Sequence, residues 1–271
     1  MHALNVLILF YNSYSFNDVY YSVAEILLKN IHHLFRLTIY DWAELCHVST
    51  ATISRFCQKL GYKSFHEFKL ELSSAVDNYY VLNQFAPINQ LEKYDNEQIA
   101  YLSIMRETID DIYKTVDLNR IDQMADMLHQ YDSIRIYTHG VSVNESSLQS
   151  NLIMSGRQAK AIWSSSAQLK DIETLTGDAL VLLTLPNVYE KTLSLDILQA
   201  LKDKNIPILL FTNSKYSQFL KYADFSYCFN GIMTQLDDTR FSLLISLLAI
   251  SYRRKYLQNS EDMVSETKKA K

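Results

Sequence analysis

The second half of the chain alternates short, continuous apolar runs with stretches of helical periodicity, and no other feature limits the fold as strongly. Continuous apolar runs of this length are typical of parallel strands that are covered by helices on both faces. We therefore predict an α/β domain with a doubly wound parallel sheet. The expected strands are Ile134–Thr138, Lys160–Trp163, Ala179–Thr184, Ile206–Thr212 and Phe225–Phe229, and the expected helices lie near residues 143–156, 166–174, 190–204, 216–222 and 236–252.

The first part of the chain has a different pattern, with apolar residues spaced three and four apart. This spacing predicts four closely spaced helices, over residues 18–34, 40–46, 50–60 and 65–76. The periodicity weakens around Pro87, which marks a linker. The expected organisation is an all-α helix-turn-helix domain at 1–77, a linker at 78–105, an α/β domain at 106–255 and a tail at 256–271.

The composition excludes several classes of protein. The 26 Lys and Arg residues against 30 Asp and Glu give a net charge of −4, which excludes a wholly basic protein that coats nucleic acid. Cys46, Cys57 and Cys228 form no C-x-x-C pair, so we expect neither disulfides nor a zinc site, and no other metal or cofactor. No apolar run reaches the roughly 20 residues of a membrane span. We expect a soluble, cytoplasmic protein without membrane contacts.

The segment from Thr38 to Lys69 predicts a helix-turn-helix, with Ser49 as N-cap of the second helix and Gly61 just after its end. Short hydroxyls in the first turns of that helix and an arginine in its middle suit entry into the major groove of DNA. Small helical bundles in general also show such caps and an exposed arginine, so these residues alone leave DNA binding about as probable as a purely structural role. The candidate DNA-binding residues are Ser49, Thr50, Ala51, Thr52, Ser54, Arg55, Gln58, Lys59 and Lys63.

The string AELCHVSTATISRFCQKLGYKSFHEFK strongly resembles the N-terminal domain of the RpiR (MurR/RpiR) family of bacterial transcriptional regulators. The resemblance rests on Val48–Ser49, Ala51–Thr52, Arg55–Phe56, Leu60–Gly61 and the Phe65 and Phe68–Lys69 positions. It implies a sequence-specific DNA-binding regulator of carbohydrate-metabolism genes. It also implies that the C-terminal part is a sugar isomerase (SIS) domain, which dimerises and senses a sugar phosphate or another metabolite.

The charge of the first domain limits this interpretation. Residues 1–77 hold six Lys and Arg against seven Asp and Glu. A single copy of this N-terminal domain, which we call a head, can therefore neutralise few DNA phosphates. Two heads would about double the contacts. We therefore predict that the protein acts as a homodimer or homotetramer through residues 106–255, and that an isolated head binds double-stranded DNA poorly.

The strand at 134–138 leads into His139-Gly140-Val141-Ser142 and then a helix, an arrangement that can hold an anion on backbone N–H groups. An ordinary turn with Ser142 as N-cap explains the same residues. By resemblance to the G-x-G-x-S loop of SIS domains, Gly140 and Ser142 match, whereas Thr138 replaces the first glycine. The candidate ligand residues are His139, Gly140, Ser142, Thr184 and Asn187.

The second phosphate loop of SIS domains, of the form S-x-S-G-x-T, is degenerate here. The chain has no glycine in this loop, Pro186 lacks an N–H, and Glu190 adds a negative charge. Simple hexose phosphates are therefore expected to bind weakly, and either the effector differs or the domain serves only to dimerise. A phosphosugar isomerase and a module that binds other proteins remain as alternatives, and no catalytic residue is assigned.

Overall fold

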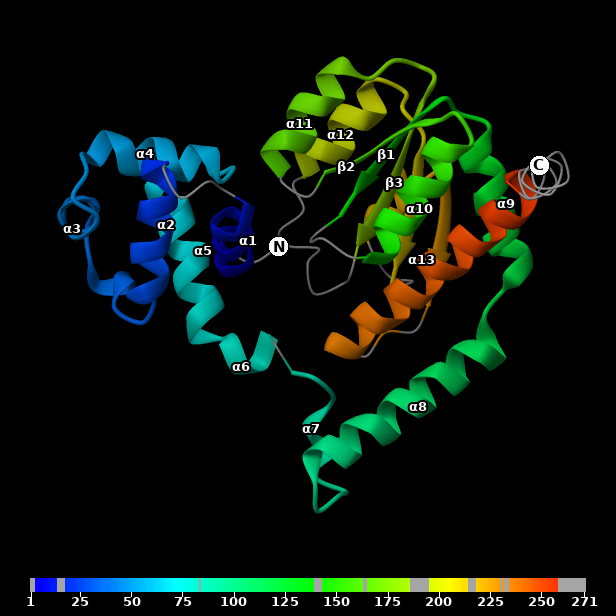
Figure 1. Ribbon diagram of the computed structural model, residues 1–271, viewed down its shortest axis with the longest axis horizontal. Coiled ribbons are helices and arrows are strands. Elements are labelled where there is room, and N and C mark those ends of the chain that lie inside the picture. The colour runs from blue at the N-terminus through cyan, green and yellow to red at the C-terminus, as the bar shows by residue number, and fades with distance from the viewer. Residues whose placement is uncertain are drawn as a thin grey trace, which may run out of the picture. The chain divides into compact units, whose positions relative to one another are not determined.

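A computed structural model describes residues 3–13, 18–82, 84–138, 143–162, 165–185, 195–213, 218–229, 231 and 234–257 (Figure 1). The chain divides into two compact units. The first comprises Met1–Asn83 with Ser164–Lys170, and the second comprises Gln84–Trp163 with Asp171–Lys271.

The first unit is a bundle of helices. Its elements are α1 (Ala3–Ser13), α2 (Val19–Lys29), the 3₁₀ turn η1 (Leu34–Arg36), α3 (Ile39–Leu45), α4 (Thr50–Lys59), α5 (Phe65–Asp77) and α6 (Tyr79–Leu82). Helix α1 was not predicted, although its buried residues Ala3, Leu7 and Phe10 recur at helical spacing and pack into the core. The helix expected over 18–34 ends at Lys29, and the chain continues into the 3₁₀ turn.

Large aromatic side chains hold this bundle together. Trp42 of α3 is fully buried, donates its indole N–H to the Leu34 carbonyl at 3.2 Å, and meets Phe65 edge-to-face at 5.0 Å. Phe56 of α4 is fully buried and packs edge-to-face against Phe10 at 5.3 Å. Because α3 and α4 are each anchored by a buried ring, their outer faces are held in a fixed relation to each other.

Within the described residues, four helices end in the same type of turn, in which one residue adopts a left-handed backbone. At the end of α3 this residue is His47 with φ 54°, and at the end of α4 it is Gly61 with φ 99°. The hydrogen bonds are those of a Schellman motif: Val48 N–H bonds to Ala43 C=O at 2.9 Å, and Tyr62 N–H bonds to Cys57 C=O at 3.0 Å. Gly156 and Asn205 end two helices of the second unit in the same way.

The second unit is a five-stranded, all-parallel sheet with helices on both faces, as predicted (Figure 1). The strand order is β2-β1-β3-β4-β5. The helices are α7 (Ile88–Leu91), α8 (Glu97–Thr115), α9 (Leu118–His129), α10 (Val143–Met154), α11 (Ser165–Thr174, which belongs to this unit from Asp171 on), α12 (Leu195–Asp203), the 3₁₀ turn η3 (Gln218–Tyr222) and α13 (Gln235–Tyr256). The strands are β1 (Ser133–Tyr137), β2 (Gln158–Ile162), β3 (Ala179–Leu185), β4 (Ile208–Thr212) and β5 (Phe225–Cys228).

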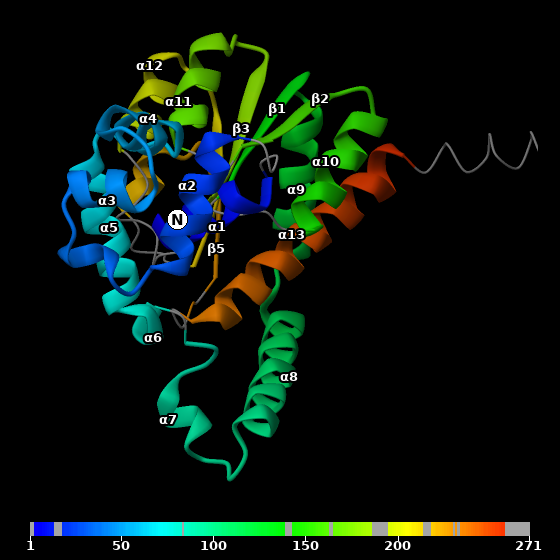
Figure 2. The ribbon, with the colours of Figure 1, turned by 60° about the vertical axis from the view of Figure 1, so that its left-hand side comes forward.

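Alternate residues of each strand supply the two faces of the sheet. Ile134 and Ile136 of β1 join Leu180 and Leu182 of β3 in one buried cluster with residues of α9, α10 and α13. Arg135 and Tyr137 therefore point to the opposite face, where they contact α11. Figure 2 shows the two helical layers, with α9, α10 and α13 on one side and α11 and α12 on the other.

Edge strand β2 is protected on its open side. Gln158 N–H and Ile162 C=O bond toward β1, so the peptide groups of Ala159 point away from the sheet. The Gln149 side chain of α10 donates to the Ala159 carbonyl at 3.0 Å. Lys160, whose side chain is 62% exposed, adds a charge to the same edge.

The predicted fold class, an all-α helix-turn-helix domain followed by an α/β domain with a parallel sheet, is confirmed. The largest shifts among the strands are at β2, which begins at Gln158 and not at Lys160, and at β4, which begins at Ile208 and not at Ile206. The boundary expected between the linker and the α/β domain, at residues 105 and 106, falls inside helix α8. Of the helices that the structure describes, none is both long and apolar enough to cross a membrane.

Candidate DNA-binding face and ligand site

Helices α3 and α4 form the helix-turn-helix, and local hydrogen bonds define both of its N-termini. Thr38 and Asp41 form a capping box at α3, with Thr38 N–H bonding to the Asp41 carboxylate at 2.6 Å. These bonds from the Thr38 backbone and hydroxyl lower the pKa of Asp41. Ser49 caps α4 by accepting from Thr52 N–H at 3.1 Å, and its hydroxyl lies 2.9 Å from that of Thr52.

The outer face of α4 carries most of the predicted DNA-binding residues. Ala51, Arg55 and Gln58 are exposed, and Thr50 and Ser54 are half-buried. These five positions fall on one side of the helix, opposite the buried Ile53, Phe56 and Cys57. The structure thus brings Thr50, Ala51, Ser54, Arg55 and Gln58 together on one continuous face.

The remaining predicted residues are placed differently. Ser49 and Thr52 form the helix cap, and Thr52 lies on the flank of α4. Lys59 is on the same flank, where its ammonium lies 4.8 Å from the centre of the Tyr20 ring and 3.9 Å from Asp18. Lys63 is exposed in the loop that leads to α5, with its backbone N–H bonded to Glu67 at 2.6 Å. The contact between Lys59 and Tyr20 was not predicted, because the two residues lie on different helices.

Arg55 differs from its neighbours because it makes no ion pair with any residue that the structure describes. Its helix is fixed by Phe56 and Ile53, both fully buried. Lys69 supports the same region from α5 by donating to the Leu37 carbonyl at 2.6 Å, just before α3. A rigid helix that presents a charged, exposed arginine is suited to bind an anionic or hydrogen-bonding partner.

A second candidate site lies at the carboxyl ends of the central strands. The strand order reverses between β1 and β3, and open α/β sheets bind ligands at such a point. The β1–β3 register, continued by one residue, brings Thr138 level with Thr184 on the same face. Both threonines are buried, at 2% and 6% exposure. Of the predicted ligand residues, Thr184 is thus at this edge, whereas His139, Gly140, Ser142 and Asn187 lie outside the described residues.

The end of β4 continues this edge toward α13. Asn213 is buried and its side-chain amide donates to Asp237 in the first turn of α13 at 2.7 Å. Gly231 donates its N–H to the Asn213 carbonyl, and a Cβ at this glycine would lie 2.6 Å from Asn213 Cβ. Asp237 in turn lies 3.9 Å from Arg240, which pairs with Asp111 of α8 at 3.4 Å. This chain of contacts was not predicted, because it joins residues far apart in the sequence.

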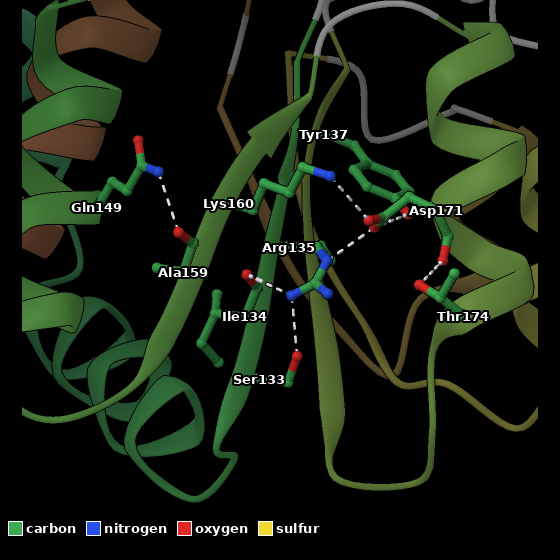
Figure 3. A network of polar contacts seen from close by, with 9 residues as sticks. All are labelled: Ser133, Ile134, Arg135, Tyr137, Gln149, Ala159, Lys160, Asp171 and Thr174. Atoms are coloured by element: carbon green, nitrogen blue, oxygen red, sulfur yellow. Dashed lines mark hydrogen bonds and ion pairs between the residues drawn. The ribbon is translucent and has the colours of Figure 1, made fainter.

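The opposite face of β1 carries a buried ionic network (Figure 3). Arg135 donates to Asp171 of α11 at 2.7 Å, the Tyr137 hydroxyl donates to the same carboxylate at 3.1 Å, and Lys160 lies 3.4 Å away. Burial and the neighbouring Asp171 raise the pKa of Tyr137, so the phenol stays protonated and remains a donor. The Asp171 carboxylate therefore has three donors, and its role here is to join α11 to β1 and β2.

The family comparison agrees with the geometry of the first unit. Residues 11–79 match the family described as "Helix-turn-helix domain, rpiR family". The chain is similar to an uncharacterized HTH-type transcriptional regulator of Haemophilus influenzae, with 23% identity over 257 residues that cover 91% of this chain and 87% of that protein. It is also similar to the HTH-type transcriptional regulator HexR of Escherichia coli, with 28% identity over 122 residues that cover 44% of this chain and 41% of HexR.

Two solved structures resemble the chain more loosely. The Vibrio vulnificus NanR protein, complexed with ManNAc-6P, aligns at 20% identity over 98% of this chain and 97% of that chain, with a TM-score of 0.49. The sugar isomerase domain of an RpiR transcription factor from Sphaerobacter thermophilus aligns at 13% identity over 62% of this chain and 96% of that chain, with a TM-score of 0.48.

The first unit, with its capped turn and exposed α4 face, belongs to the class of helix-turn-helix proteins. Residues 11–79 thus form a helix-turn-helix domain of the rpiR type, and the chain is similar to two HTH-type transcriptional regulators.

Proposed function

We propose that α4 recognises double-stranded DNA in the major groove, and that the α/β unit controls this binding in response to a small anionic metabolite. The residues that would contact DNA are Thr50, Ala51, Ser54, Arg55 and Gln58 on the outer face, with Lys59 and Lys63 near the phosphates and Ser49 and Thr52 at the helix start.

The observation that carries the proposal is the contrast on α4 between a fixed inner face and a charged outer face. Ile53, Phe56 and Cys57 are buried, so the helix cannot rotate without disrupting the core. Arg55 has no ionic partner among the described residues, and a guanidinium in this position can pair with the O6 and N7 atoms of guanine. The short side chains of Ala51 and Ser54 allow the helix to approach base edges closely.

The proposed function requires two heads. With six basic against seven acidic residues in 1–77, one head gains little from counterion release. A homodimer or homotetramer would place two copies of α4 on a single operator, and a ligand could then act by changing how the two heads are spaced.

The proposed ligand site is the carboxyl edge at β1 and β3. Thr138 and Thr184 provide hydroxyls there, and both are buried, which suits a small polar ligand more than a large one. A sugar phosphate is the proposed class. The sequence that follows β3 includes Pro186 and Glu190, so simple hexose phosphates should bind weakly.

We infer binding without turnover at this site. Isomerisation needs a positioned acid or base beside the sugar. The buried carboxylate nearest the end of β1 is Asp171, and Arg135, Lys160 and Tyr137 all engage it from the α11 face. Its three donors hold this carboxylate on the face of the sheet opposite Thr138 and Thr184, so it is not positioned beside a sugar bound there. This supports the regulator over the alternative of a phosphosugar isomerase.

The experiment that tests the DNA proposal is the substitution Arg55→Ala, measured by gel-shift titration at fixed salt against operator fragments selected from genomic DNA. The loss of base contacts should weaken specific binding by about 1–3 kcal/mol while thermal unfolding stays unchanged. Arg254→Ala is the matched control, because Arg254 is also exposed but pairs with Asp122 of α9. Equal affinities for the Arg55→Ala variant and the unaltered protein would contradict the proposed role.

The ligand proposal is tested by calorimetry of the full chain against a panel of phosphorylated sugars. Thr184→Val preserves the volume of the side chain and removes its hydroxyl, so it should weaken any binding at this edge by about fivefold or more. Micromolar binding that is insensitive to Thr184→Val would place the ligand elsewhere.

A further inference from the structure

Helix α8 has two apolar faces, and the fold of the second unit uses only one of them. Ala100, Ile104 and Thr108 form the buried inner face. Ile104 clusters with Ala86 and with Leu236 at the start of α13. The outer face carries Ile99, Leu102, Ile109 and Tyr113, which are 58%, 66%, 47% and 85% exposed. Figure 2 shows α7 and the start of α13 beside α8.

The outer residues are spaced as in a coiled-coil seam. Ile99, Leu102, Arg106, Ile109 and Tyr113 are separated alternately by three and four positions, which is the a/d repeat of a heptad. We call these five residues the α8 stripe. A stripe of this kind packs well against another helix and poorly against a flat surface, because its side chains insert between those of the facing helix.

We propose that the α8 stripe binds the α8 stripe of a second copy of this chain, with the two helices antiparallel. A two-fold axis requires a surface to complement itself. The stripe meets this requirement because its single cation, Arg106, has an acidic neighbour at Asp110 on the flank of the same helix. Neither Arg106 nor Asp110 forms an ion pair with another described residue of its own chain, so both charges remain to be paired across the axis.

The heptad spacing determines which residues face each other. In an antiparallel pair, a positions pack against d positions, and an axis between residues 107 and 108 satisfies this for Leu102, Arg106, Ile109 and Tyr113. Ile99 then lies level with Val116, the C-cap of the other α8. Arg106 then lies level with Ile109 of the second copy and within one residue of its Asp110. Leu102 lies level with Tyr113 of the second copy, an aliphatic residue against an aromatic ring.

The size of the stripe is sufficient for a specific contact. Four large apolar side chains on each copy, each about half exposed or more, would together remove on the order of 1,000 Å² from water, near the lower limit for a specific interface. This inference rests on the proposed action of two heads on one operator, and it adds the surface that joins the copies.

The first test is the mass of the full-length protein in solution without DNA, measured by sedimentation equilibrium. Leu102→Glu should raise the dimer dissociation constant about 100-fold or more, because both copies lose an apolar contact and gain a carboxylate in the interface. Met154→Glu is the matched control, since Met154 is an apolar residue on α10 that is 74% exposed and lies outside the stripe. Circular dichroism checks that both variants fold.

The second test exchanges the two charges. Arg106→Asp alone and Asp110→Arg alone should each weaken the dimer by about tenfold, and the double variant should return to within about threefold of the unaltered protein. This recovery is expected only if Arg106 faces Asp110 of the other copy.

Two results would overturn the inference: a monomeric unaltered protein at micromolar concentration, or a dimer that Leu102→Glu leaves intact. The failure of this inference is distinguishable from the failure of the proposed function. If Leu102→Glu leaves the mass unchanged while Arg55→Ala still abolishes specific DNA binding, the protein is a DNA-binding dimer that is joined elsewhere.

Discussion

Arg55 on α4 and Arg135 on β1 have the same side chain in opposite surroundings. Arg55 is exposed and has no ionic partner among the described residues, whereas Arg135 is only 14% exposed and is bonded to Asp171, Ser133 and the Ile134 carbonyl. A buried guanidinium must be paired to compensate for the loss of water, and its contacts then stabilise the fold. An exposed guanidinium costs little to leave unpaired, so it remains available for a partner outside the chain. Burial and ionic pairing therefore distinguish a structural arginine from one that is available to a partner, although both carry the same charge.

The strongest test of this comparison is Asp171→Ala. It leaves Arg135 buried without its carboxylate and removes the acceptor of Tyr137, so we expect a loss of about 3–5 kcal/mol in the free energy of unfolding, measured by urea denaturation. Glu25→Ala is the control. It breaks the exposed pair of Glu25 with Lys29 on α2 and should cost less than about 0.5 kcal/mol. Similar losses in the two variants would contradict the structural role of the network.

A smaller effect is expected where the same turn is formed by different residues. Gly61→Ala places a Cβ on a backbone with φ 99° and should destabilise the protein by about 1 kcal/mol. His47→Gly relieves a non-glycine residue with φ 54° and should raise the free energy of unfolding by about 0.5 kcal/mol. Gly177→Ala is the control, because a Cβ there has no atom within 4 Å and its φ lies outside the left-handed region. Thermal unfolding of the three variants measures these differences, and a stable Gly61→Ala variant would count against the turn geometry.

The smallest expected effect concerns pH. His129 stacks on Tyr256 at 3.6 Å, and burial together with the nearby Arg157 lowers its pKa. The folded protein therefore binds fewer protons than the unfolded chain, so stability is lost as pH falls through the unfolded pKa of about 6.5. His129→Gln should flatten this decline between pH 7 and pH 5 by under about 1 kcal/mol, as measured by urea denaturation across that range. An unchanged slope would mean that His129 does not contribute.

Much of the fold was predictable because its signals are local. The apolar runs gave the strands to within two residues, and Ser49 and Gly61 marked the ends of α4. Helix α1 was missed, although Ala3, Leu7 and Phe10 already show helical spacing.

The contacts of the candidate sites were less predictable, because they join residues far apart in the chain. Arg135 and Asp171 are 36 positions apart, and the only local signal was a charged residue in the middle of an apolar strand, which requires a buried partner. The position of Lys59 above the Tyr20 ring depends on how α2 packs against α4, which the sequence pattern does not specify. The exposure of Arg55, by contrast, follows from the helical period alone.

The closed edge of β2 has a consequence for how the protein behaves when it is concentrated. Because Gln149 occupies the outward carbonyl of Ala159 and Lys160 charges the same edge, another strand cannot extend the sheet there without displacing a hydrogen bond and burying an ammonium group. Edge-to-edge association of two sheets through β2 is therefore disfavoured in the folded protein. The side-chain amide of Gln149 and the ammonium group of Lys160 thus both oppose the growth of fibres from this edge.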